Sequence, residues 1–306
     1  MRILITGGTG FLGGKMALEL QNRDKEIILI KREQWDGSDK YSYLKTLLSD
    51  KKDTTFVHLS AIADMRICES DYELCNKVNI KQLASLLSFL SNSVVSNFIF
   101  ASSMAVYGDT GNEVKSESDE AGFNSKYGES KLTGEKLLRD WSITNNKTVF
   151  AFRIANLYGY RADGRVHDKG VLSYLIKELL KGDSISIEIS KNTHLSAKRD
   201  FINVDDCVDL LLRGVYFKEF IESHTLYEKR FNCFNIAKGQ GDEISAIAIF
   251  LAQYLNFKGF INLKISDKVS NGVGSNAKTS EVFNWVVTHK LYDDLRGMVE
   301  SYKLEI

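Results

Sequence analysis

The sequence predicts an α/β fold in which a doubly wound parallel sheet is joined to a smaller, mixed α/β C-terminal domain. Short apolar runs alternate with helical patterns through the first half of the chain, as in consecutive β-α units. The first apolar run ends in closely spaced glycines that lead into a helical pattern. With 43% hydrophobic and 26% charged residues over 306 positions, the chain can bury a large core. These observations favour one large domain with a smaller partner over several small modules.

The charge balance and the apolar runs limit the partners that we expect. Lys and Arg together number 40, as do Asp and Glu, so no net field favours nucleic acid or an anionic membrane. The start of the chain lacks the pattern of a signal peptide. The longest helical apolar run, Ile244–Leu255, is too short to span a bilayer. We therefore expect a cytoplasmic protein that binds neither nucleic acid nor membrane.

The spacing of cysteines and histidines predicts neither disulfides nor a metal site. The cysteines are Cys68, Cys75, Cys207 and Cys233. They contain no C-x-x-C pair, so we expect free thiols in a reducing compartment. The five histidines form no pair with ligand spacing, so we expect no metal.

The first β-α unit carries the pattern of a phosphate site. The strand Arg2–Thr6 runs into T-G-G-T-G-F-L-G, with Gly7, Gly10 and Gly13, and a helical pattern continues to Leu20. Such glycines let the backbone approach a pyrophosphate, and the helix N-terminus offers free N–H groups to it. The alternative is a tight turn that only packs the helix on the strand. Because both the strand and the helix are present, we predict a Rossmann-type dinucleotide site.

The next strand, Glu26–Ile30, ends where such a site contacts the adenosine ribose. NAD sites usually place a carboxylate here, which accepts hydrogen bonds from the ribose hydroxyls. This chain has Lys31 and Arg32, two cations that would attract the additional phosphate of NADP. A solvated basic turn is the alternative. We favour NADP over NAD as the cofactor.

The third unit begins after a polar segment. Residues 33–52 form no recognisable β-α unit, and the strand Thr54–Leu59 follows, ending in H-L-S-A. We expect Leu59 and the small Ala61 to lie beside the cofactor, where it passes over the sheet edge.

An amphipathic helix is predicted over Asn79–Leu90, because leucines recur there at helical spacing. Most of that stripe should face the core. Asn79, at the start of the helix, is either an N-cap or a residue of the cofactor site.

A serine, a tyrosine and a lysine form the predicted catalytic group. Ser103 follows an apolar strand, at the carboxyl end where open α/β sheets bind ligands. Tyr127 and Lys131 lie on the next predicted helix, four residues apart. The Tyr-x-x-x-Lys pattern has two further copies, starting at Tyr41 and Tyr254. Only the middle copy follows a strand-end serine within the β-α units.

These three side chains can catalyse proton transfer coupled to hydride transfer. A free tyrosine has a pKa of about 10, so its phenolate costs about 4 kcal/mol at neutral pH. A lysine cation ~4–6 Å away offsets about 3–4 kcal/mol at an effective dielectric of about 20. We therefore expect Lys131 to lower the pKa of Tyr127 and to bind the nicotinamide ribose. Tyr127 would take a proton from a substrate alcohol or return it to a carbonyl, and Ser103 would orient that oxygen.

The second half of the chain is more mixed and supplies the expected substrate domain. We place the dinucleotide domain at 1–156, with a returning segment near 200–217, and the substrate domain at 157–199 and 218–306. The elements predicted there are strands at Thr148–Ile154, Ser184–Ile189 and Phe231–Ile236, and helices at Val171–Lys181, Cys207–Val215, Ile244–Leu255, Thr279–Val286 and from Tyr292 onward.

Seven segments, in this order and spacing, resemble the extended short-chain dehydrogenase/reductase family. They are TGGTGFLGG, HLSA, KVNIKQL, FASSMAVYG, YGESKLTGE, FRIANLYGYR and KRDFINVDD. Within the family, the chain resembles the NAD-dependent epimerase/dehydratase type, such as UDP-glucose 4-epimerase and related nucleotide-sugar ketoreductases. Towards the C-terminus the resemblance is one of general pattern, as the variable substrate domain implies.

The resemblance implies roles for residues along the chain. Phe11 and Leu12 would lie against the cofactor pyrophosphate. The catalytic positions are matched by Ser103, Tyr127 and Lys131. Asn156 and Arg199 would contact the substrate diphosphate, for which a guanidinium is well suited. The alternative for Arg199 is an ion pair with Asp200 or Asp205. The family often dimerises through the helices that bear Asn79 and Tyr127, which implies a homodimer.

Two departures from the family pattern narrow the prediction. Lys31 and Arg32 replace the acid of NAD-using epimerases, and Met104 and Ala105 follow Ser103 where 4,6-dehydratases have an acidic pair. We therefore predict an NAD(P)-dependent nucleotide-sugar oxidoreductase, a C4 epimerase or a 4-ketoreductase, acting on a nucleotide-diphosphate sugar. The alternatives are a non-catalytic dinucleotide-sensing protein and a ketoreductase for a non-sugar carbonyl.

Overall fold

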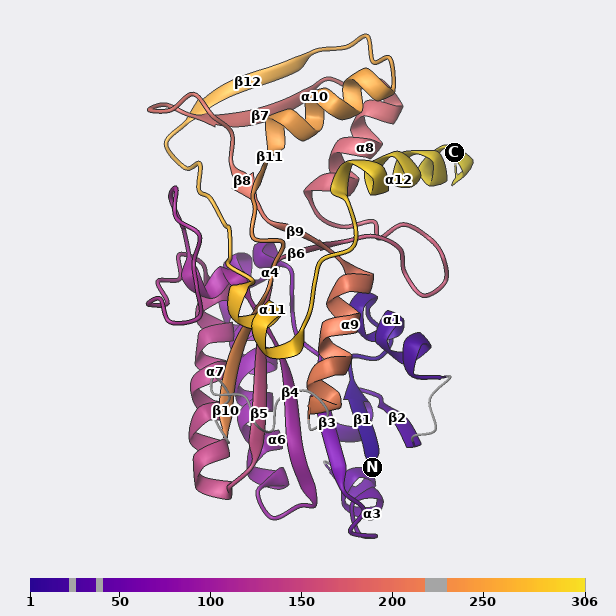
Figure 1. Cartoon of the computed structure of the whole chain (residues 1–306), viewed down its shortest axis with the longest axis vertical. Helices are drawn as coiled ribbons and strands as arrows, with labels where there is room; N and C mark the ends of the chain where they lie inside the picture. The colour runs from indigo at the N-terminus through magenta and orange to yellow at the C-terminus, as the bar shows by residue number, and fades with distance from the viewer. Residues whose placement is uncertain (22–25, 37–40, 218–229, 306) are drawn as a thin grey trace.

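The computed structural model describes residues 1–21, 26–36, 41–217 and 230–305, and a six-stranded parallel sheet lies at its centre (Figure 1). The strands are β1 (Arg2–Thr6), β2 (Glu26–Ile30), β3 (Thr54–His58), β4 (Val95–Ser103), β5 (Thr148–Ile154) and β10 (Phe231–Ile236). Their order is β10-β5-β4-β3-β1-β2, so the chain leaves β1 for β2 and returns to the other side of β1 for β3. The carboxyl ends of β1 and β3 therefore flank the crevice in which such sheets bind ligands. The predicted parallel sheet is confirmed.

Helices cover both faces of the sheet. One layer consists of α1 (Phe11–Leu20), α9 (Val204–Val215) and α11 (Ala277–Phe283), and the other of α3 (Ser42–Leu47), α6 (Gln82–Leu90) and α7 (Lys126–Asn145). Ile3 and Ile5 belong to the core under the first layer, and Leu4 belongs to the core under the second. Successive side chains of a strand point to opposite faces, so an unbroken apolar run suits a strand buried on both sides.

A third core forms the smaller domain, at the top of Figure 1. Its elements are α8 (Val171–Lys181), α10 (Ile244–Tyr254), α12 (Leu291–Glu305) and the paired strands β7 (Ile185–Ser190) and β12 (Ile261–Ser266). β10 and α11 pack in the sheet domain, although both lie within the segment 218–306 that we expected in the substrate domain. Residues 218–229 of that segment lie outside the described residues. No helix in the described ranges is both long and apolar enough to cross a membrane.

Two segments differ from their predicted structure. The helix expected from Asn79 begins earlier, as α5 (Tyr72–Asn76), and continues through a π-helical turn, η1 (Lys77–Lys81), into α6. Asn79 lies in that π turn, so the N-cap alternative is wrong. The polar segment 33–52 contains α2 (Glu33–Asp36) and α3. The remaining short elements are α4 (Met65–Ser70), η2 (Met104–Tyr107), β6 (Asn156–Tyr158), β8 (Lys198–Arg199), β9 (Phe201–Asn203) and β11 (Asp242–Glu243).

The expectation of four free thiols is wrong for one pair. Cys68 and Cys75 form a disulfide that joins α4 to α5. The chain turns at Asp71, which ends α4 and caps α5, and this turn brings the two Cα atoms to 5.1 Å. Because the turn is a tertiary feature, the spacing of the two cysteines did not reveal the pair. Cys207 and Cys233 are free and buried.

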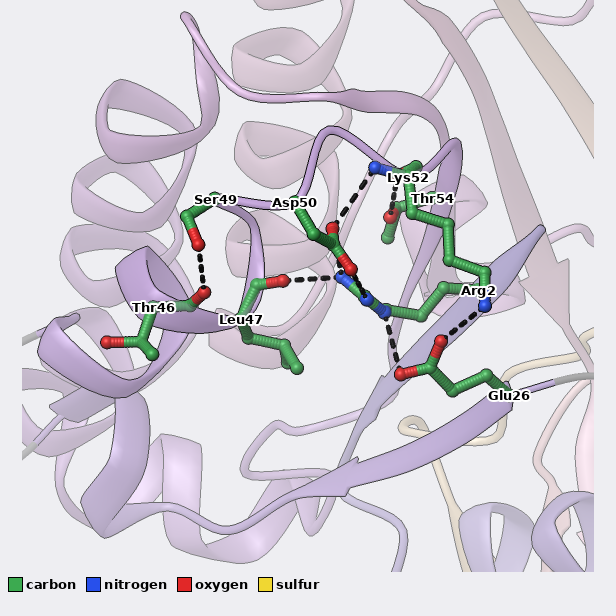
Figure 2. A network of polar contacts seen from close by, with 8 residues as sticks. All are labelled: Arg2, Glu26, Thr46, Leu47, Ser49, Asp50, Lys52 and Thr54. Carbon is green, nitrogen blue, oxygen red and sulfur yellow. Dashed lines mark hydrogen bonds and ion pairs between the residues drawn. The ribbon is translucent and has the colours of Figure 1, made fainter.

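A buried cation, Arg2, lies at the amino edge of the sheet, and Figure 2 shows its polar contacts. Arg2, only 3% exposed, pairs with Glu26 of β2 at 3.1 Å and with Asp50 before β3. Lys52 pairs with the same Glu26 at 2.6 Å. The Arg2 guanidinium holds the pKa of Asp50 below its ordinary value. These ion pairs join the starts of β1, β2 and β3, at the opposite edge of the sheet from the predicted catalytic residues.

Candidate active site

The turn between β1 and α1 is shaped by glycines at which no side chain fits. Gly7 has a φ of +74°, and a Cβ atom there would lie 2.8 Å from the backbone of Leu59 and Ser60. A Cβ atom on Gly13 would lie 2.1 Å from the carbonyl oxygen of Gly7. α1 begins directly after Gly10, so its first N–H groups lie beside this turn without intrahelical acceptors, as a phosphate site requires.

Replacing Gly13 with alanine should open this turn. The added methyl group overlaps the backbone of Gly7, which has no flexible side chain that could move away. We expect a loss of about 1–3 kcal/mol in stability and a loss of dinucleotide binding. Thermal unfolding and titration with dinucleotide, followed by tryptophan fluorescence, measure the two effects.

The matched control is Gly14→Ala on the same helix. Its Cβ atom would meet the Cβ atom of Ala162 at 3.6 Å, an ordinary contact. This variant should keep the stability and the dinucleotide affinity of the wild type. Equal behaviour of Gly13→Ala and Gly14→Ala would contradict the close approach that we describe.

A pocket of about 400 Å³ opens beside the glycine turn. It is lined by Gly7, Gly8, Thr9, Leu29, Ile30, Lys31, Arg32, Glu33, Trp35 and Ser60. The predicted residues Lys31 and Arg32 lie at its rim and are exposed. Leu59 and Ala61 flank Ser60, which itself lines the pocket. The pocket therefore joins the turn to the end of β2, as a site for the adenosine half of a dinucleotide would.

The predicted catalytic side chains converge at the carboxyl edge of the sheet. Ser103 is the last residue of β4 and Tyr127 lies in the first turn of α7, with the Ser103 hydroxyl close enough to the phenol to act on its pKa. Lys131, one turn further along α7 and only 4% exposed, donates from Nζ to the carbonyl oxygen of Ala101 at 2.8 Å. Its Nζ lies 5.8 Å from the centre of the Tyr127 ring.

Two small residues allow α7 to start so close to Ser103. Ser125 caps the helix, and its hydroxyl accepts a hydrogen bond from the Gly128 N–H at 3.0 Å. A Cβ atom on Gly128 would lie 2.4 Å from the carbonyl oxygen of Ala105, just beyond β4. The glycine therefore lets the first turn of α7 press against the chain that follows Ser103, and this contact holds Tyr127 over the strand end.

Burial dominates the proton affinities of this group. It raises the pKa of Tyr127 to about 12, while the nearby Ser103 hydroxyl opposes the rise. It lowers the pKa of Lys131 to about 8, while Glu135 opposes the fall. Our expectation that Lys131 would lower the pKa of Tyr127 is therefore wrong for the groups of the protein itself. Lys131 is buried and Tyr127 is half-buried, and loss of water around them disfavours their charged forms.

A model of the NAD dependent epimerase/dehydratase family matches residues 3–225. The chain belongs to this family. The predicted resemblance to the extended short-chain dehydrogenases/reductases is thereby confirmed. A protein of Bacillus subtilis, described as the uncharacterized UDP-glucose epimerase YtcB, is 29% identical over 234 residues, covering 68% of this chain and 70% of that protein.

Solved structures share the fold of this epimerase/dehydratase family member along its whole length. The UDP-glucose 4-epimerase of Thermotoga maritima, solved with UDP-glucose, has a TM-score of 0.81 at 22% identity, covering 100% of this chain and 99% of that one. The protein RMD of Pseudomonas aeruginosa, solved with NADPH, has a TM-score of 0.78 at 20% identity, covering 100% of both chains. At these identities the likeness establishes the fold, and the ligands are those of the two proteins compared.

In this epimerase/dehydratase chain, Asn79 ties the loop after β3 to α7. Its Oδ1 accepts from the Ile62 N–H at 2.8 Å, and its Nδ2 donates to the Ser130 hydroxyl at 3.1 Å. The Ser130 hydroxyl in turn donates to the Tyr127 carbonyl oxygen at 2.8 Å. A contact of Asn79 with the cofactor stays a prediction, whereas its role in holding the Tyr127 turn follows from these bonds.

The two predicted diphosphate contacts lie in the segment that leads to the smaller domain. Asn156 is exposed, and its Nδ2 donates to the Asp200 carbonyl oxygen at 2.9 Å. The guanidinium of Arg199 donates to the carbonyl oxygen of Ser270 and, at 3.3 Å, to its hydroxyl. Backbone bonds of this kind fix the position of the Arg199 side chain and do not neutralise its charge.

The ion-pair alternative for Arg199 is wrong, because both candidate carboxylates are engaged elsewhere. Asp200 accepts from the backbone N–H groups of Lys238 at 2.7 Å and Gly239 at 3.0 Å. Asp205 pairs with Lys15 of α1 at 2.6 Å.

Proposed function

We propose that this chain is an NAD(P)-dependent nucleotide-sugar oxidoreductase that acts at C4 of the sugar, as a C4 epimerase or a 4-ketoreductase. The observation that carries the proposal is the convergence of Tyr127 and Ser103 at the carboxyl end of β4, with Lys131 one turn along α7 and bonded to Ala101 of the same strand. A phenol and a hydroxyl that meet at one substrate oxygen can move a proton to or from it. The membership of the epimerase/dehydratase family supports the same chemistry.

The glycine turn suits the phosphates of a dinucleotide, because α1 begins directly after Gly10 and its first N–H groups have no intrahelical acceptors. The residues that would hold the pyrophosphate are Gly7, Gly10, Phe11, Leu12 and Gly13. Leu59, Ala61 and Asn79 would lie further along the cofactor, towards the nicotinamide ribose at Tyr127 and Lys131. When bound, the dinucleotide supplies the acceptor or the donor of the hydride.

In this proposal Tyr127 exchanges a proton with the oxygen on the sugar C4. Because the pKa of Tyr127 is raised to about 12, the phenol is protonated at neutral pH and is ready to donate to a carbonyl oxygen. Ser103 would hydrogen-bond the same oxygen and orient it. Asn156 and Arg199 would contact the substrate diphosphate, which a guanidinium binds with two parallel hydrogen bonds.

We favour NADP as the cofactor because cations line the pocket beside the glycine turn. Lys31 and Arg32 stand at the end of β2, where a carboxylate would repel a ribose phosphate. The fold itself accepts either cofactor, since related structures were solved with NADPH and with NAD. A cofactor exchanged at each turnover suits a reductase, whereas an epimerase retains its cofactor.

The double variant Lys31→Asp with Arg32→Ser tests this preference. NADPH affinity should fall by about 10–100-fold, as expected for losing one or two charge-assisted hydrogen bonds, while NADH affinity stays within a few-fold. Isothermal titration with each dinucleotide measures the change. Lys81→Asp, an exposed lysine outside the pocket, is the matched control. An unchanged ratio of the two affinities in the double variant would remove the reason for choosing NADP.

We also propose that the chain forms a homodimer through α6 and α7, the helices that the family resemblance implies. Light scattering on the purified protein would give twice the chain mass if this is correct. A cytoplasmic location stays a prediction.

Turnover of a panel of nucleotide-diphosphate sugars and their 4-keto forms tests the function. Interconversion of C4 epimers with no net change in dinucleotide identifies an epimerase, and consumption of NADPH or NADH with a 4-keto sugar identifies a ketoreductase. Dinucleotide binding without turnover of any sugar or carbonyl would favour the non-catalytic sensor. Turnover of non-sugar carbonyls alone would favour the third alternative. Either of these last two results would overturn the proposal.

A further inference from the structure

A buried carboxylate lies one turn beyond Lys131 on the same face of α7. Glu135 is only 4% exposed, and residues four apart on a helix lie side by side. A carboxylate withdrawn from water is stable only when it is paired and hydrogen-bonded. Glu135 must therefore have a cation and hydrogen-bond donors around it.

The partners of Glu135 come from three neighbouring strands of the sheet, β4, β5 and β10. From β10, the Cys233 thiol donates to Oε2 at 3.6 Å. The guanidinium of Arg153 on β5 binds both carboxylate oxygens, with Nε to Oε1 at 3.0 Å and the second contact at 2.7 Å. The hydroxyl of Ser102 on β4 donates to Oε1. Ser102 and Arg153 face each other in the register of β4 and β5. One side chain of α7 therefore bonds to three adjacent strands.

These bonds of Glu135 lie directly beside the predicted catalytic residues. Ser102 precedes Ser103, and the carbonyl oxygen of Ala101 accepts from Lys131. Two successive turns of α7, at residues 131 and 135, are thus bonded to residues 101 and 102 of β4. These bonds fix the position of α7 along the direction of β4. They therefore also fix the position of Tyr127 relative to Ser103.

The far side of Arg153 extends the same network to the segment after Ser103. Its second terminal nitrogen donates to the Tyr107 hydroxyl at 2.8 Å, and that hydroxyl donates to Asn235 of β10 at 2.9 Å. Arg153, Tyr107 and Asn235 are all nearly inaccessible to solvent. A shift of Glu135 would therefore displace Ser102, which precedes the catalytic serine, and Tyr107, which follows it.

We infer that Glu135 is a positioning residue of the active site, which holds α7 and the end of β4 in the relative position that the catalytic group needs and supplies the anion behind Lys131. The inference rests on the proposed function. Glu135 acts through Lys131 and Ser102 and does not itself touch the substrate.

The groups around Lys131 decide the electrostatic part of this inference. They are Tyr127 and Glu135 on α7 and His58 on β3. Arg153 on β5 and Cys233 on β10 contact Glu135, and Tyr107 in η2 contacts Arg153. Burial lowers the pKa of His58 to about 3 and raises the pKa of Tyr107 to about 12, so both are uncharged at neutral pH. Burial also raises the pKa of the Cys233 thiol. Burial lowers the pKa of Lys131, and Glu135 is the group that raises it.

Glu135→Gln tests the inference, because glutamine keeps the shape and loses the charge. Without the anion the pKa of Lys131 falls below about 8, so the activity lost as Lys131 deprotonates is lost at a lower pH. We expect the alkaline limb of the pH–rate profile to move down by about one unit. We expect kcat to fall by about 10–100-fold through misplacement of the catalytic group, with little change in KM. Asp140→Asn, an exposed carboxylate on the same helix, is the matched control.

Glu135→Asp distinguishes the effect of the negative charge from the effect of the bonds to Arg153 and Ser102. It keeps the anion but shortens the reach to Arg153, so its kcat should fall while the alkaline limb stays at the wild-type pH. Lysine labelled with ¹³C at Cε reports the charge of Lys131 without turnover, with the signal assigned by its absence in Lys131→Arg. The Lys131 signal should titrate at lower pH in Glu135→Gln than in the wild type.

The outcomes are distinct. A Glu135→Gln variant with the wild-type pH profile and the wild-type Lys131 titration overturns the inference, whatever its thermal stability. A wild-type protein without turnover refutes the proposed function, and the labelled lysine then still decides whether Glu135 controls the charge of Lys131.

Discussion

Replacing Tyr127 with phenylalanine should lower kcat by about 10²–10⁴-fold, the usual contribution of a general acid or base. The variant removes one oxygen atom from the group at the end of β4, and Ser103 alone cannot supply the proton at neutral pH. Dinucleotide affinity should change by no more than a few-fold, because the glycine turn, the pocket beside it and Lys131 are kept and only the Tyr127 hydroxyl beside the nicotinamide ribose is lost. Steady-state turnover of the best nucleotide sugar, together with a dinucleotide titration, measures both quantities.

Tyr174→Phe is the control for this variant, since Tyr174 lies on α8 and is 51% exposed. It should retain full activity. A Tyr127→Phe protein that turns over at the wild-type rate on every nucleotide sugar tested would refute Tyr127 as the acid/base, even if the fold and the cofactor assignments stand.

The second large effect is on stability. Arg153→Met should lower the free energy of unfolding by about 3–5 kcal/mol, because it leaves the carboxylate of Glu135 buried without its cation. Chemical denaturation, checked by thermal unfolding, gives the size of the loss.

The double variant Arg153→Met with Glu135→Leu shows whether the unpaired charge causes that loss. Removing both charges should recover much of the stability, since apolar residues of similar size can replace a buried ion pair at small cost. If the double variant is as unstable as Arg153→Met alone, the loss comes from packing or from the bond to Tyr107, and the charge argument is wrong.

The residues that the sequence predicted best are those whose meaning depends on local order. Gly7 and Gly13 lie between a strand and a helix that both have clear patterns, and the structure places them as a turn that excludes side chains. Ser103 and Tyr127 were predicted from a strand end and a helix in the same β-α unit, and their side chains meet. The helix Val171–Lys181 and the strand Phe231–Ile236 are confirmed with the predicted bounds.

What the sequence did not reveal depends on contacts between distant segments and on burial. The π turn at Asn79 is an irregularity in the middle of a helix, and no residue type marks it. The disulfide between Cys68 and Cys75 depends on the turn between two short helices. The raised pKa of Tyr127 follows from burial, which spacing alone does not give.

The pairing of Glu135 with Arg153 crosses from a helix to a strand, so sequence patterns could not join the two residues. A weaker signal was present, because Glu135 continues the Tyr127 and Lys131 face of the same helix at i+4 spacing. Carboxylates on a helix face that also carries a catalytic lysine therefore merit attention before a structure is known.

We propose that Tyr127, Ser103 and Lys131 act on the sugar C4 of a nucleotide sugar beside a bound dinucleotide. Incubating the protein with NADP or NAD and a nucleotide sugar deuterated at C4, followed by mass spectrometry of both, tests it most directly. We predict that deuterium reaches the nicotinamide ring, or the C4 position of the epimer, in the wild type and more than about 100-fold more slowly in Tyr127→Phe. Label that never leaves the starting sugar for any nucleotide sugar tried, or equal transfer in the two proteins, would contradict the account.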